Sequence, residues 1–124
     1  MLQFLSLLIL AVAFFAPKHE SLFACNLNAL SASERTRHFV ELGPKLRSLK
    51  TGVRELKDGY EFRFPSDPKT IALLAEWMAQ EHLCCPFFQI ELRVEPNAGP
   101  AWLRLTGPEG TKQFIQADAA AWLK

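Results

Sequence analysis

The stretch GYEFRFPSDPKTIALLAEWMAQEHLCC, residues 59–85, joins a strand pattern to a helix pattern and decides the fold. Its first residues alternate aromatic and polar side chains, as in a strand with one buried face: Tyr60, Phe62 and Phe64. Asp67 and Pro68 then form a typical helix start, because Asp caps free N–H groups and proline fits the first turn. The helix pattern runs up to two adjacent cysteines and Pro86, which cannot continue a helix comfortably. This stretch therefore predicts a strand, a short connection and a helix in succession.

Similar patterns flank this stretch on both sides. Ser31 and Glu34 match a capping box and predict the start of a first helix, which Gly43-Pro44 is expected to break or kink. Further strand patterns occupy residues 53–56, 88–94 and 101–105, and a last helix is expected after Gly107 and Pro108. The expected fold is α+β: an N-terminal helix, then two strand-strand-helix units that form an antiparallel four-stranded sheet with the helices on one face.

Two finer expectations concern side-chain positions. If Gly59 takes the left-handed conformation of a three-residue loop, Leu56 lies opposite Tyr60 in the first hairpin. The central helix is expected to bury one apolar stripe: Ile71, Leu74, Ala75, Met78 and Cys85. The adjacent cysteines then occupy its last turn or the exit from it.

The chain divides into a hydrophobic leader and one domain. Residues 1–24 are expected to be a signal peptide or membrane anchor, because residues 1–16 carry no charged side chain. Residues 25–124 form a single α+β domain by length. We expect an exported or membrane-anchored protein, with membrane contact through residues 1–16 if the leader is retained. A cytoplasmic location stays open, since no Lys or Arg precedes the apolar run and Lys18 follows it.

The charge balance excludes one class of partner. The formal net charge is +1, and charges of both signs are mixed along the chain without a polybasic tail. Nucleic-acid binding is therefore not expected. Composition leaves the oligomeric state open.

The chain has three cysteines, Cys25, Cys84 and Cys85. Since the number is odd, at least one thiol stays free or pairs with another molecule. Glu81 and His82 precede the adjacent pair by three or four residues, so they share a helix face with it. Cys25, just before the first helix, is placed to fold back and supply a third sulfur.

These residues support three functional interpretations. The first is a soft-metal site for Cu(I), Zn or Hg, built from Cys84, Cys85 and Cys25 with His82, for sequestration or delivery without turnover. The second is a thiol enzyme in which Cys85 is the nucleophile and Glu81 or His82 moves a proton. A helix C-terminus raises a thiol pKa, which argues against this enzyme. The third is a structural or interaction domain with packed, inert cysteines.

Several stretches resemble a family of small uncharacterised bacterial proteins with a CCPF-type motif. They are CNLNAL, SER, ELKDGYEFRFP, AEWMAQEHLCCPFF and WLRLTGPEGTKQFI, and together they span roughly residues 25–116. The resemblance implies no established activity, so it supplies no catalytic residues. At the level of topology, doubled strand-strand-helix units are similar to the core of organomercurial lyase and of the copper chaperone of nitrous oxide reductase. That similarity implies soft-metal handling through sulfur, although the lyase's two cysteines and aspartate have no counterparts that can be assigned here.

Overall fold

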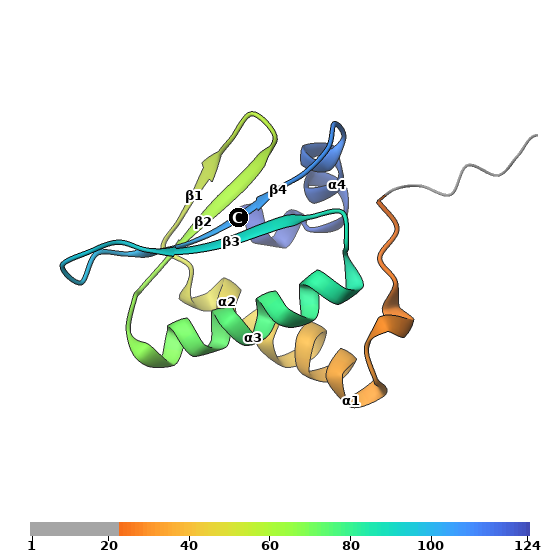
Figure 1. Cartoon of the computed structure of the whole chain (residues 1–124), viewed down its shortest axis with the longest axis horizontal. Coiled ribbons are helices and arrows are strands. Elements are labelled where there is room, and N and C mark those ends of the chain that lie inside the picture. The colour runs from red at the N-terminus through yellow and green to blue at the C-terminus, as the bar shows by residue number, and fades with distance from the viewer. Residues whose placement is uncertain (1–22) are drawn as a thin grey trace, which may run out of the picture.

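The computed structural model describes residues 23–124. Its elements follow the expected order, helix and then strand-strand-helix twice, so the α+β prediction is confirmed (Figure 1). In chain order they are η1 (Leu27–Ala29), α1 (Ala32–Arg35), η2 (Thr36–Leu42), α2 (Gly43–Leu49), β1 (Gly52–Glu55), β2 (Gly59–Phe64), α3 (Pro68–Cys84), β3 (Gln89–Val94), β4 (Ala101–Thr106), α4 (Thr111–Asp118) and η3 (Ala120–Leu123).

The four strands form one antiparallel sheet in the order β1-β2-β4-β3. In Figure 1, α1, α2 and α3 lie together on one side of this sheet. The C-terminal elements join the same layer, because Trp122 of η3 contacts both Phe62 of β2 and Trp77 of α3. The core lies between the helices and this face of the sheet, and Phe62, Leu103 and Leu74 are fully buried there.

The first helical segment is continuous from α1 through η2 to α2 but changes its winding. Ser31 begins it with the expected capping box. η2 is a π-helix, in which the Gly43 N–H donates to the carbonyl of His38, five residues earlier. Pro44 has no N–H to continue the α-helical bonding pattern across this point. The expected break at Gly43-Pro44 therefore appears as a wide turn before the proline, not as an interruption.

The register of the first hairpin differs from the expectation. Glu55, not Leu56, lies opposite Tyr60. Gly59 is the first residue of β2 rather than a left-handed loop residue, and the chain between residues 23 and 124 has a positive-φ glycine only at Gly110. A Cβ at Gly59 would collide with the carbonyl of Leu105 on β4. Glycine is needed here because two strands approach closely, which local turn chemistry does not reveal.

The buried stripe of α3 is rotated relative to the prediction. Thr70, Leu74, Trp77, Glu81 and Cys84 are buried, at spacings of three and four residues. Of the expected stripe, Leu74 and Cys85 are buried, whereas Ala75 is exposed. The predicted stripe followed apolar residues at helical spacing, so it left out Glu81, which the structure buries. The face of α3 that packs against the core therefore includes Glu81.

The predicted leader, residues 1–24, falls almost entirely outside the described residues. Within residues 23–124, no helix is long and apolar enough to cross a membrane. Phe23, at the start of the described chain, packs against Phe87 and Phe114.

Candidate functional site

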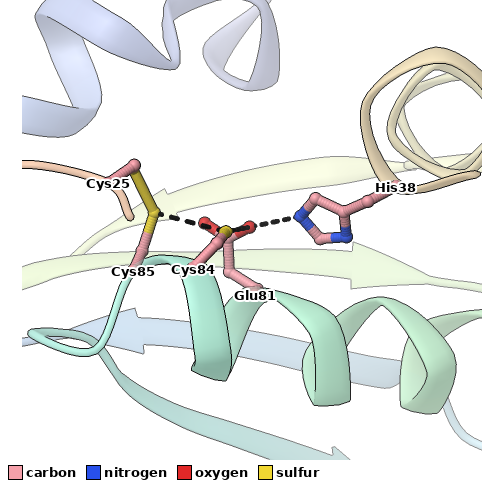
Figure 2. Close-up of a disulfide and its surroundings, with 5 residues drawn as sticks. All are labelled: Cys25, His38, Glu81, Cys84 and Cys85. Atoms are coloured by element: carbon pink, nitrogen blue, oxygen red, sulfur yellow. Dashed lines mark hydrogen bonds and ion pairs between the residues drawn. A yellow bond between two sulfur atoms is a disulfide. The ribbon is translucent and has the colours of Figure 1, made fainter. Parts of the chain in front are cut away.

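A disulfide between Cys25 and Cys85 joins the N-terminal segment to the end of α3 (Figure 2). The two Cα atoms are 4.7 Å apart, within the usual range for a disulfide. The Asn26 N–H also donates to the Cys84 carbonyl at 2.7 Å, so it satisfies one of the carbonyl groups left free at the helix end. The N-terminal segment is thus held against α3 by one covalent bond and one backbone hydrogen bond.

Cys84 is the third cysteine and the free one. Its side chain is fully buried, with Sγ 3.7 Å from Cys85 Sγ and 3.6 Å from Glu81 Oε2. Burial, and secondarily the charge of Glu81, raises the pKa of the Cys84 thiol from 9.0 to about 12. The expectation of at least one unpaired thiol is confirmed, and this thiol stays protonated at neutral pH.

His38 of η2 completes the group around Glu81. Its Nε2 lies 2.5 Å from Glu81 Oε2, and its Nδ1 lies 3.0 Å from the side-chain carbonyl oxygen of Gln80. Because that carbonyl oxygen can only accept, Nδ1 carries a hydrogen and Nε2 faces the carboxylate. The imidazole is also stacked on Trp77, with ring centroids 5.4 Å apart. These contacts hold the ring in one orientation, with Nε2 directed at the cysteine cluster (Figure 2).

The arrangement forms a compact buried set of metal-ligand atoms. One ligand atom each from His38, Glu81 and Cys84 lies within 4.8 Å of the others, and all three residues are buried. Each of these atoms bears or shares a proton that a metal ion can replace. The disulfide lies beside them, since Cys85 Sγ is in contact with Cys84 Sγ. A thiol beside a disulfide is the arrangement that thiol–disulfide exchange requires, and imidazole, carboxylate and thiolate are side-chain groups known as metal ligands.

The structure brings together three of the four predicted site residues. Cys25, Cys84 and Cys85 meet at one place, whereas His82 is exposed on the outer side of α3. His38, which the sequence reasoning missed, supplies the imidazole from an element 43 residues earlier. One signal was present: His38, Leu42 and Leu46 follow each other at intervals of four, and all three are buried. A histidine in the apolar stripe of a helix is expected to be buried and therefore to need a buried polar partner.

Comparison of the chain with protein-family models, curated proteins and solved structures found no match.

Proposed function

We propose that the protein, in its reduced form, binds one thiophilic metal ion, Cu(I), Zn or Hg, through the thiolates of Cys25, Cys84 and Cys85, with His38 as a further ligand. Its role is sequestration or delivery of the ion, and no turnover is needed. The observation that carries the proposal is the Cys84 thiol in contact with a buried His38–Glu81 pair, with Cys85 Sγ of the Cys25–Cys85 disulfide 3.7 Å from Cys84 Sγ.

The sulfur spacing fits a shared ion. Two sulfurs on one tetrahedral zinc ion, each about 2.3 Å from it, lie about 3.8 Å apart. Cys84 Sγ and Cys85 Sγ are 3.7 Å apart. Cys25 must move away from Cys85 after reduction, and it can, since it belongs to a segment that enters no strand and no α-helix.

The surroundings of His38 suit a metal ligand. Histidines that bind metals usually donate their other ring N–H to an oxygen, and the Nδ1 of His38 meets Gln80 Oε1 in this way. Nε2 then remains as the ligand atom. Glu81 lies between His38 and Cys84 and accepts the proton that either group releases, or it binds the ion itself.

The competing thiol enzyme has less support. A nucleophilic cysteine needs a lowered pKa and access to substrate. Cys85 is bonded to Cys25, and the pKa of Cys84 is raised by burial. His82, one of its two proposed proton carriers, is exposed rather than beside the sulfurs. A nucleophilic thiol must be ionised before it attacks, whereas a metal ion displaces the proton from sulfur as it binds. A raised thiol pKa therefore weakens metal binding without preventing it.

The test compares the oxidised and reduced full-length protein. The disulfide is reduced with a phosphine under anaerobic conditions, zinc or Cu(I) is added, and bound metal is counted after gel filtration. We expect one ion per reduced chain, protection of the thiols from alkylation, and little metal on the oxidised protein. Cys84→Ser and His38→Gln should weaken binding at least tenfold.

His82→Gln is the matched control, because it removes an exposed imidazole from the same helix end. It should bind like the wild type. If the reduced, folded protein retains no more metal than Cys84→Ser does, the cysteines serve as a crosslink and packed core, and the metal proposal is wrong.

A further inference from the structure

A cavity of about 230 Å³ lies next to the disulfide. Its walls are largely aromatic and come from the sheet and from the helices that cover it: Phe62, Trp77, Phe88, Phe114 and Trp122. Phe39, Asp118 and Ala121 also line it and are exposed, so the cavity reaches the surface beside η2 and η3. The interior is thus apolar and connected to solvent.

One wall of the cavity is the disulfide itself. Cys25 and Cys85 both line the cavity, together with His38 and Glu81, whereas Cys84 does not. Cys25 is the more accessible of the two bonded cysteines, since Cys85 is 2% exposed and Cys25 is half-buried. A molecule inside the cavity therefore lies beside the two residues whose bond must be reduced to form the proposed metal site.

We propose that this cavity binds a small organic thiol with an apolar ring or chain, which reduces the Cys25–Cys85 disulfide. The inference rests on the proposed function for its purpose, because reduction generates the three-thiol site. An engineered apolar cavity of about 150 Å³ takes up benzene, so the volume here is sufficient for a ring carrying a short thiol arm.

The lining favours an uncharged body over a charged one. Glu81 is engaged by His38, and Arg47 lies with its guanidinium 6.0 Å from the centre of the Trp122 ring. Asp118 is at the exposed edge. A charged thiol would lose hydration on entering this interior, and Arg47, a lining cation, already lies over the Trp122 ring, whereas an aromatic ring gains contact with aromatic side chains.

The reaction is a thiol–disulfide exchange in two steps. The thiolate of the bound molecule attacks one sulfur, Cys25 being the accessible one; the S–S bond breaks, and Cys85 leaves as a thiolate and takes up a proton. A second thiol molecule attacks the resulting mixed disulfide and releases Cys25. Two thiols are oxidised to one small-molecule disulfide, and the protein disulfide receives the two electrons and two protons.

The test is the rate of disulfide reduction in the full chain without added metal. The probes are benzyl mercaptan and 2-mercaptoethanol, alkyl thiols that differ mainly in the ring. Cys25 and Cys85 thiols are counted by acid quenching, alkylation and mass spectrometry. We expect the rate to saturate with benzyl mercaptan, to rise linearly with 2-mercaptoethanol, and to fall at least fivefold when toluene, which has no thiol, competes with benzyl mercaptan.

A matched pair of variants locates the effect. Ala119 lines the cavity, whereas Ala117 lies exposed on α4. Ala119→Phe should remove the saturation, and Ala117→Phe should leave it unchanged. If Ala119→Phe fails to fold, toluene competition in the wild type decides. Linear rates with both thiols, or no effect of toluene, would overturn the inference. The metal proposal would survive that result, since its own test uses a phosphine.

Discussion

Two buried glutamates on opposite sides of the sheet show how differently one residue type is used in this protein. Glu61 of β2 is 2% exposed and Glu81 of α3 is 8% exposed. Glu61, on the sheet face opposite α1, α2 and α3 (Figure 1), is bound by Arg54 at 2.8 Å and lies 3.7 Å from Arg93. Both arginines also lie over the Trp102 ring. Glu81 has no Lys or Arg partner among the described residues and contacts His38 and Cys84 instead.

The two glutamates differ in whether the groups that pair with them can give up a proton. A buried carboxylate needs a cation or a proton, because its charge is costly to desolvate. Arginine keeps its proton at every accessible pH, so the Glu61 region has one arrangement. His38 and Cys84 carry protons that a metal ion can displace. The ion pairs of Glu61 are therefore fixed at every accessible pH, whereas the protons around Glu81 are the ones that the proposed metal ion would replace.

The largest expected effect is the loss of the crosslink beside Glu81. The disulfide closes a loop of 60 residues, and the restriction of the unfolded chain is worth about 4 kcal/mol. Cys25→Ser should lower the free energy of unfolding by up to that amount in urea titration. Adding a phosphine should destabilise the wild type similarly and leave Cys25→Ser unchanged. Equal urea midpoints for oxidised and reduced wild type would contradict the crosslink.

The next effect compares the two glutamates directly. Glu81→Ala leaves the Nε2 of buried His38 without its partner, which should cost about 3 kcal/mol. Glu61→Ala should cost about 1 kcal/mol, because Arg54 and Arg93, with side chains 58% and 48% exposed, regain water. Urea titration of both variants measures the difference. The comparison fails if Glu61→Ala proves the more destabilising change.

A third effect is a loss of stability that begins only when the pH rises above about 9. The pKa of the Cys84 thiol is raised from 9.0 to about 12 in the folded protein, so the unfolded chain loses this proton first. Its contribution to stability is complete below pH 9 and is lost as the pH rises towards 12. The wild type should lose stability more steeply over this range than Cys84→Ala, as thermal unfolding at each pH will show. Parallel curves for the two proteins would mean that the thiol is not protected by burial.

The smallest expected change in stability is at His82, the predicted metal ligand that is exposed in the structure. His82 is exposed, so His82→Ala should change the free energy of unfolding by less than about 0.5 kcal/mol. His38→Ala, which empties a fully buried position, should cost several times more. Similar values for the two variants would remove the distinction between them.

Local patterns in the sequence accounted for the elements themselves. The capping box at Ser31, the cap at Asp67 and the core-facing aromatics of β2 each depend on neighbours a few residues away, and all three were predicted correctly. The opposite face of β2 was expected to be polar and exposed, but Glu61 is buried there. The position of Cys84 and Cys85 at the end of α3 was also predicted correctly, because Pro86 cannot continue the helix. The odd cysteine number already required an unpaired thiol.

Tertiary structure alone decided which side chains complete the site. His38 and Glu81 are 43 residues apart, and Cys25 and Cys85 are 60 apart. Their meeting depends on the π-helical turn before Pro44, the rotation of α3 about its axis and the return of the N-terminal segment to the end of that helix. The sequence by itself determined strands, helices and the place of the cysteine pair, since these follow from contacts between near neighbours. The partners of that pair follow from the packing of whole elements, which no local pattern encodes.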